Sequence, residues 1–420
     1  MATPEAVQDA DQTVRRPRGL RALVTATYVS SLGDGALAAA APLAAAAITR
    51  DPAAVALVSA AEYLPWLVVT PFAGALVDRW RLRTVLVVAD VLRAGGLALL
   101  AILIIAGAAS IPVLAATACA IVVGQIFGDT AAQTIVVDLA GRDSGALNKA
   151  NGHISSATTA GKSLVGPPIG SGLYAAVPWL PFVLDAVSFA VSAGLVASLP
   201  KRRGPTSRAG RPRLLASIGE GARFLVQHAQ LRVLCLLVAS ANLASFMAMS
   251  TFVLFATERL GVTTAGYGVL LAASAVGGVA GGFASGRIAQ WLGARPTIIA
   301  GLALQVVVWP AIGWTSSPYI AGALLAVVGL CAAVTTVVCV TARQQLTPAA
   351  MLGRVISAFR TVSAGTAPLG ALLGGGLAAV VDLRAPFYVA GVVLMAAVLV
   401  SLPSLRSVQA DPISTEGVGQ

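Results

Sequence analysis

Charged residues are scarce in this sequence. Asp, Glu, Lys and Arg make up 11% of its 420 residues, whereas about 25% is usual for a soluble domain. A soluble chain of this length needs polar side chains to cover its surface, and too few are present. Because hydrophobic residues reach 57%, the composition also excludes an intrinsically disordered chain. The sequence therefore predicts a protein whose surface faces lipid.

Residues that bind metals or carry catalysis are equally rare. The chain has 2 histidines and 4 cysteines, and each cysteine lies in an apolar run without a CxxC or CxxH neighbour. We therefore expect neither a disulfide framework nor a zinc site. A membrane-embedded enzyme would need convergent groups such as paired histidines, so we predict no catalytic residue, no metal and no cofactor. No GxxxxGK[ST] loop occurs, which excludes ATP-driven pumping by this chain alone.

Long apolar segments account for most of the chain. A helix needs about 20 such residues to cross a bilayer, and the first segment, at roughly 30, is too long for the core of a signal peptide. Ala and Leu dominate without polar–apolar alternation, which disfavours strands. We predict an all-α integral membrane protein with twelve transmembrane helices over 21–49, 54–77, 84–107, 112–137, 150–177, 180–199, 231–257, 266–291, 296–314, 318–342, 355–380 and 386–404.

The distribution of basic residues predicts the orientation. Lys and Arg number 28 against 17 Asp and Glu, a formal net charge of +11. With both termini in the cytoplasm, three basic residues lie inside spans and three in external loops, which leaves 22 of the 28 in cytoplasmic segments. This asymmetry follows the positive-inside rule. The net charge therefore indicates orientation rather than a nucleic-acid partner, and the external residues are Arg50, Arg259 and Arg384.

One long basic connection divides the chain into two halves. It runs over 200–230, begins with Lys201-Arg202-Arg203 and continues into an amphipathic stretch with Leu214, Ile218, Gly221, Ala222 and Leu225 on one face. We predict a cytoplasmic tail over 1–20, a six-helix bundle over 21–199, a cytoplasmic linker with an amphipathic helix over 200–230, a second six-helix bundle over 231–404 and a cytoplasmic tail over 405–420.

The two halves repeat each other's short motifs. Gly74 to Arg79 corresponds to Gly282 to Arg287, and Gly166 to Gly170 corresponds to Thr366 to Gly370. Repeats at matching spans predict two bundles related by a pseudo-two-fold axis, with the substrate held between the halves near the middle of the membrane.

Two of these motifs resemble signatures of the major facilitator superfamily. Gly74 to Arg83 (Gly-Ala-Leu-Val-Asp-Arg-Trp-Arg-Leu-Arg) resembles its motif A, and Gly161 to Gly172 (Gly-Lys-Ser-Leu-Val-Gly-Pro-Pro-Ile-Gly-Ser-Gly) resembles motif C, the antiporter signature of helix five. Three shorter segments are similar to the branch of enterobactin exporters and macrolide-efflux proteins, namely Leu32 to Gly35, Leu64 to Trp66 and Asp185 to Phe189.

The resemblance implies a secondary active transporter that exports a small organic molecule, such as a drug, natural product or siderophore, by alternating access in exchange for protons. The Arg that proton-coupled members carry in helix four is absent from 112–137. An importer or facilitator of the same fold without proton coupling therefore stays open, and a membrane-embedded enzyme or a non-transporting receptor is the remote alternative. Motif A also departs from the family at Arg81, where Gly is usual.

The two motifs predict two mechanical devices. A gating latch comprises Gly74, Asp78, Arg79, Arg83 and Asp138, in which Asp78 faces a helix N-terminus of the other half and Arg79 or Arg83 pairs with Asp138. Alternatively, these charges only fix the orientation of the chain in the membrane. A kink in the fifth span, which a generic bend would explain equally, comprises Gly161, Gly166, Pro167, Pro168 and Gly170.

Ionisable residues inside spans are costly and mark transport pathways. Asp34, between Gly33 and Gly35 near the middle of the first span, is the preferred proton site, although it could instead satisfy local backbone donors. Glu62 and Asp129 either line the cavity or pair with another helix. Lys162 either holds an anionic substrate or, as we favour, pairs with Asp34 or Asp129. We further interpret Asp185 through the dipole of its helix, and Asp90 with Arg93 as a structural pair.

The expected setting follows from these predictions. The partners are a small-molecule substrate and the lipid bilayer, without nucleic acid, and the proton gradient is the energy source. We expect a monomer in the bacterial plasma (inner) membrane with both termini in the cytoplasm. An Ala- and Arg-rich, Lys-poor chain is typical of a GC-rich bacterial genome, in which such exporters often serve natural-product export or drug resistance.

Overall fold

The computed structural model describes residues 4–77, 80–140, 152–198, 214–348 and 351–406. Throughout this part of the chain the secondary structure is helical, without strands, which confirms the predicted all-α class. Nine of the described helices are long and apolar enough to cross a membrane, and the apolar helices Pro52–Val68 and Ala385–Ser401 are shorter. The predicted segments fall on helices, and those over 54–77, 150–177 and 231–257 are each divided among two or three helical pieces.

The described residues of the first half form α-helices and one π-helix, and residues 152–158 are an α-helical stretch that leads into the π-helix. The second predicted span breaks at Val69 and the fifth contains a π-helical turn, so neither is a single straight helix. The elements are α1 (Pro4–Ile48), α2 (Pro52–Val68), α3 (Thr70–Val77), α4 (Leu82–Ile105), α5 (Ile111–Ala140), the π-helix η1 (Thr159–Val165), α7 (Gly166–Ala176) and α8 (Leu180–Ala197). Because α1 begins at Pro4, its helix extends into the segment predicted as an N-terminal tail.

The second half follows the predicted amphipathic helix. Its elements are α9 (Leu214–Gln227), α10 (Ala229–Met249), α11 (Phe252–Leu254), the π-helix η2 (Phe255–Arg259), α12 (Thr264–Leu292), α13 (Ala294–Trp314), α14 (Pro318–Leu346), α15 (Leu352–Val380) and α16 (Ala385–Arg406). Polar side chains and prolines start several of these helices in both halves. The Asp51 carboxylate, for example, accepts a hydrogen bond from the Ala53 amide at 3.0 Å at the start of α2.

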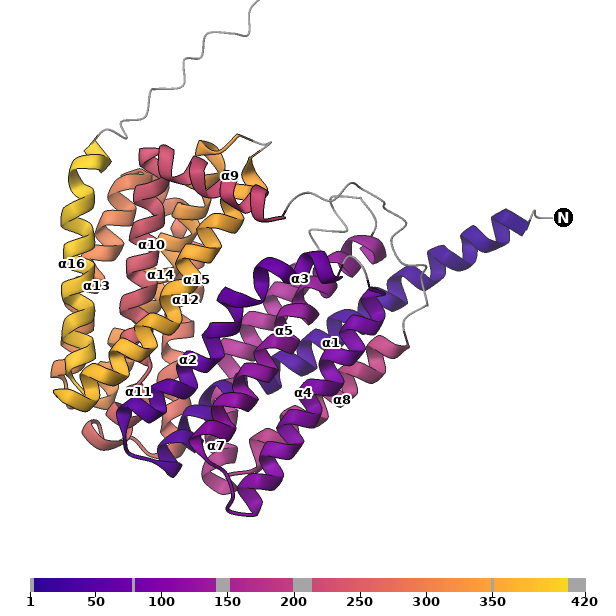
Figure 1. Ribbon diagram of the computed structural model, residues 1–420, viewed down its shortest axis with the longest axis horizontal. Helices are drawn as coiled ribbons and strands as arrows, with labels where there is room; N and C mark the ends of the chain where they lie inside the picture. The colour runs from indigo at the N-terminus through magenta and orange to yellow at the C-terminus, as the bar shows by residue number, and fades with distance from the viewer. Residues whose placement is uncertain (1–3, 78–79, 141–151, 199–213, 349–350, 407–420) are drawn as a thin grey trace, which may run out of the picture.

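The two halves stand side by side, and α9 lies across one end of the second half (Figure 1). We call this end the α9 end, and the opposite one, which carries the turns near Arg50 and Arg259, the Arg50 end. Helix α9 is held against α15, because Gly221 packs on the Arg354 backbone and Glu220 forms an ion pair with Arg354 at 2.5 Å. The predicted linker residues 200–213 lie outside the described part of the chain.

Small residues bring matching helices of the two halves into close contact. A Cβ at Gly166 or Gly170 of α7 would collide with the backbone of α1, and a Cβ at Gly370 or Gly374 of α15 would collide with the backbone of α10. The fifth span therefore packs on the first as the eleventh packs on the seventh. This correspondence is what the predicted pseudo-two-fold axis requires, and it depends on van der Waals packing of the kind that holds membrane helices together.

The most extensive contacts between the halves are those of α2 with α15 and of α7 with α12. Gly268 of α12 packs against the Pro167 carbonyl, and the Ser171 hydroxyl donates a hydrogen bond to the Ala265 carbonyl at 2.8 Å. Arg50 forms an ion pair with Glu258 across the same junction at 3.5 Å. These contacts lie toward the Arg50 end, so the halves are closed against each other at that end.

Two neighbouring glycines of α7 allow a test of the packing against α1. Gly170→Ala should lower the free energy of unfolding by about 1–3 kcal/mol, because its Cβ overlaps the Ala36 backbone and forces the helices apart. Gly172→Ala is the matched control, since a Cβ there meets no atom within 4 Å, and it should be neutral or stabilising by up to about 1 kcal/mol. Thermal unfolding of both detergent-purified variants measures the difference, and equal behaviour would contradict this packing.

Candidate functional site

A cavity of about 370 Å³ lies among the helices of the first half. Helices α1, α2, α4, α5 and α8 and the π-helix η1 contribute its walls, and all the residues that line it come from this half of the described chain. The substrate site that the sequence predicts between the halves stays a prediction, because this cavity lies within one half. The ring of Tyr63 nevertheless lies 4.3 Å from that of Phe246 in α10, which places one cavity wall directly at the junction.

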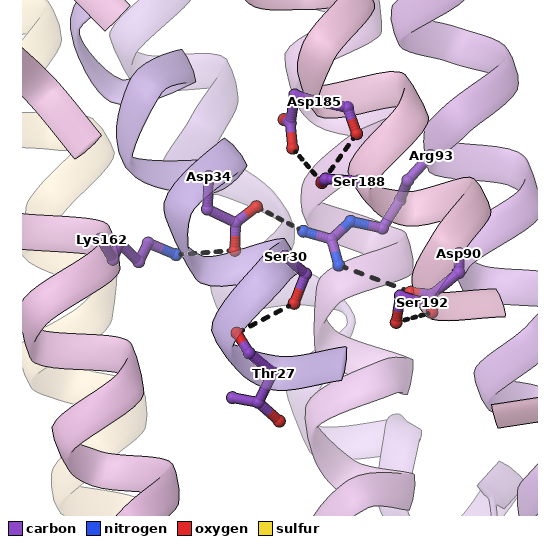
Figure 2. Close-up of polar contacts among 9 residues, drawn as sticks. All are labelled: Thr27, Ser30, Asp34, Asp90, Arg93, Lys162, Asp185, Ser188 and Ser192. Atoms are coloured by element: carbon purple, nitrogen blue, oxygen red, sulfur yellow. Dashed lines mark hydrogen bonds and ion pairs between the residues drawn. The ribbon is translucent and has the colours of Figure 1, made fainter. Parts of the chain in front are cut away.

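Asp34 lies between two cations from other helices. Its carboxylate is 2.7 Å from the Arg93 guanidinium and 3.7 Å from the Lys162 ammonium, and Figure 2 shows it between the two. Its side chain is 15% exposed, so both interactions are only weakly screened by solvent. From the sequence we favoured a pair of Lys162 with either Asp34 or Asp129, and the structure has the pair with Asp34.

Arg93 joins three helices around this ion pair. Its guanidinium lies 4.0 Å from Asp90 on its own helix, and 3.7 Å over the ring of Phe189 in α8, while the Ser192 hydroxyl donates to Asp90 at 2.6 Å. Gly124 of α5 leaves the space that the Arg93 side chain occupies. The sequence indicated the Asp90 pair but not the shorter pair with Asp34. A charged arginine in the middle of a membrane span is energetically costly, and this cost could have indicated that Arg93 belongs to the site.

Asp185 is buried beside this group rather than at a helix end. Its side chain packs against Gly33 of α1, where a Cβ would collide with it, and Ser188 donates a hydrogen bond to its Oδ1 at 3.0 Å. Its Oδ2 has no hydrogen-bond partner. The dipole explanation from the sequence is therefore replaced by a contact between α8 and α1. We refer to Asp34, Asp90, Arg93, Lys162 and Asp185 as the charged cluster.

Glu62 and Asp129, the other two predicted cavity residues, differ in their position relative to the cavity. Glu62 lines the cavity together with Tyr63 and Trp66, as one of the two readings of the sequence expected. Asp129 is exposed and is not among the residues that line the cavity, whereas Gln125, one turn earlier on α5, is among them. The structure thus brings Asp34, Glu62 and Lys162 together and leaves Asp129 beside them.

The predicted kink positions Lys162. Residues Thr159–Val165 form a π-helical turn directly before Pro167 and Pro168, because prolines cannot continue the regular hydrogen-bond ladder. Gly161 packs against the backbone of α1 at Ser31 and Leu32, and Gly166 packs against Gly35. This close approach brings the Lys162 side chain within reach of Asp34.

The predicted latch is described only in part. Asp78 and Arg79 lie outside the described residues, as do the side-chain environments of Gly74 and Asp138. Arg83 is described, and its guanidinium donates a hydrogen bond to the backbone carbonyl of Ala197 at the end of α8. The role of the latch therefore stays a prediction.

Solved transporters share this arrangement of helices. The chain superposes with a TM-score of 0.74 and 16% identity on a bacterial homologue of the human lysosomal transporter Spinster, covering 93% of this chain and 97% of that one. A bacterial homologue of the iron transporter ferroportin gives a TM-score of 0.73 and 17% identity, with 92% and 98% covered. These likenesses show that the chain has the fold of these transporters.

Residues 15–417 match the transmembrane secretion effector family, and the chain belongs to that family. It is therefore a multi-pass membrane transporter of the major facilitator superfamily and not an enzyme. Two curated relatives are named multidrug efflux pump Tap. The protein of Mycolicibacterium fortuitum is 29% identical over 83% of this chain and 87% of its own length. The protein of Mycobacterium tuberculosis is 26% identical over 93% and 94%.

Two arginine ion pairs of equal length allow a test of the charged cluster. Arg93→Gln should lower the free energy of unfolding by about 3–5 kcal/mol, because it leaves the Asp34 and Asp90 carboxylates buried without their closest cation. Arg259→Gln breaks the exposed pair with Asp382, also 2.7 Å long, and should cost at most about 1 kcal/mol. Unfolding by SDS in mixed micelles measures both. Similar losses in the two variants would contradict a buried cluster.

Proposed function

We propose that this protein is a drug efflux transporter that exports small organic molecules by alternating access in exchange for protons. The observation that carries the proposal is the cavity bordered by Asp34, whose carboxylate is shared between Arg93 and Lys162. The names of the mycobacterial relatives support a multidrug substrate range. The described cavity is mostly apolar in its lining, which suits organic molecules of drug size.

An excess of carboxyl groups supports proton exchange. The charged cluster and the cavity together contain four carboxyl groups, those of Asp34, Glu62, Asp90 and Asp185, against the two cations Arg93 and Lys162. Uncompensated charges are costly in a bilayer. Protons are the small cations that can neutralise this excess and leave again. Asp34 is the preferred proton site, because adding a proton there releases the Lys162 ammonium from its partner.

The contacts between the halves support alternating access. With both termini in the cytoplasm, the Arg50 end is the external end, and its closure by the α2–α15 and α7–α12 pairs makes this an inward-facing arrangement. Lys162 precedes α7 on the same helical segment, and α7 carries the Pro167 contact to Gly268 of the second half. A change in the protonation of Asp34 can therefore affect the contacts between the halves through the helical segment formed by η1 and α7.

The setting of the proposal is the plasma membrane of a bacterium, with the proton gradient as the energy source and no bound cofactor. The chain would work as a monomer whose partners are its substrate and the surrounding lipid. The basic segments expected at the cytoplasmic side support this orientation.

Transport in everted membrane vesicles with an imposed proton gradient tests the mechanism. The substrates are a panel of cationic, neutral and anionic fluorescent compounds. Asp34→Asn should reduce gradient-driven accumulation to the level of vesicles without the protein, because an amide cannot exchange protons. It should retain downhill exchange of the same compound, because the cavity is intact. Asp382→Asn changes an exposed carboxylate outside the cavity and serves as the matched control.

Full gradient-driven accumulation by Asp34→Asn would remove Asp34 from the proton role. Wild-type transport that is insensitive to the gradient would favour the facilitator alternative instead. Immunoblots of the vesicles give the amount of each variant, so that loss of protein is distinguished from loss of coupling.

A further inference from the structure

Glu62 faces the cavity without a cation in contact. No hydrogen bond and no ion pair within 4.0 Å joins its carboxylate to any residue that the structure describes. Lys162 is the cation that attracts it, but the Lys162 ammonium lies against Asp34. The cavity wall therefore presents a carboxyl group that the described part of the chain leaves without a direct partner.

The cations near the cavity are already engaged. Arg93 is held between Asp34 and Asp90 and covered by the Phe189 ring. An anionic ligand would have to separate Lys162 from Asp34, and breaking a half-buried pair is costly. The available charge on the described cavity wall thus favours a positively charged ligand over a negative one.

Aromatic rings flank the free carboxylate. Tyr63 is the next residue after Glu62, and Trp66 follows one helical turn later; both line the cavity and are partly exposed. The faces of Tyr and Trp rings attract organic cations, and their flat surfaces pack against aromatic ligands. The remaining walls are mostly apolar side chains such as Leu37, Val58 and Leu100, which offer no set of oxygen ligands for a hydrated metal ion.

We propose that the cavity selects aromatic organic cations, with the Glu62 carboxylate facing the positive charge and Tyr63 and Trp66 facing the ring system. This inference rests on the proposed efflux function and names the substrate class of the same cavity. Its volume of about 370 Å³ is within the range of sites for drug-sized molecules. Asp34 keeps its separate role, since its carboxylate is occupied by two protein cations.

Two ions of the same shape and opposite charge test the proposal. Tetraphenylphosphonium and tetraphenylborate differ in the sign of a central charge inside the same four phenyl rings. Equilibrium dialysis of the radiolabelled ions against the purified full chain in zwitterionic nanodiscs, with empty nanodiscs subtracted, gives both affinities. We expect the phosphonium to bind at least about tenfold more tightly, a difference of about 1.4 kcal/mol. Equal or tighter binding of the borate would overturn the proposal.

Single substitutions of glutamate residues test whether Glu62 is the group that attracts the phosphonium ion. Glu62→Gln should weaken phosphonium binding about tenfold and reduce the preference over borate, because the amide retains the shape and loses the charge. Glu62→Asp retains the charge and should keep the preference for the phosphonium. Glu220→Gln is the same chemical change in α9, away from the cavity, and should bind both ions like the wild type. Wild-type phosphonium affinity in Glu62→Gln would overturn the role of Glu62.

The result can be separated from a failure of the proposed transport function. Binding to the purified chain is measured without a proton gradient, so it does not depend on coupling. Gradient-driven export of neutral or anionic compounds, combined with no preference for the phosphonium, would reject the cation class and leave efflux in place. Thermal unfolding of each variant establishes that a loss of binding is not a loss of fold.

Discussion

The ion pair between Asp34 and Arg93 is the interaction on which this half of the molecule depends. It places a carboxylate and a guanidinium 2.7 Å apart in an apolar bundle, where neither charge is stable alone. Because Asp34 also contacts Lys162 and Arg93 also contacts Asp90 and Phe189, the pair ties α1, α4, α8 and the π-helix η1 together. The cavity lies beside this cluster. Its net charge depends on the carboxyl groups that are not paired with Arg93 or Lys162.

The second constraint is the close packing of helix backbones. Gly35, Gly161 and Gly166 let the fifth span approach the first, and this approach is what lets Lys162 reach Asp34. The same helical segment then contacts α12 through Pro167 and Gly268. Charge and packing are therefore connected along one helix, from the cavity in the first half to the junction with the second, which is the connection that an exchange of ligands across two rocking bundles requires.

The all-helical membrane fold could be predicted from the sequence, because long apolar segments without alternation report directly on membrane-spanning helices. That Lys162 pairs with a carboxylate also followed, since a lysine within a span needs one, but the sequence left Asp34 and Asp129 open as the partner. The position of Arg93 did not follow, because its local spacing to Asp90 suggested a pair within one helix, while its shorter contact is to a helix 59 residues earlier. The cavity within the first half did not follow either, because lining residues depend on how helices tilt, which short motifs do not encode.

In the proposed exchange, a proton and an organic cation compete for the same excess of carboxyl groups. The direct measurement is proton release when tetraphenylphosphonium binds to the purified protein in weakly buffered solution, followed with a pH-sensitive dye or by calorimetry in buffers of different ionisation enthalpy. Exchange of one cation for another predicts release of about one proton per bound phosphonium, since the site gains no net charge. Phosphonium binding without proton release, at every pH at which it binds, would contradict the exchange.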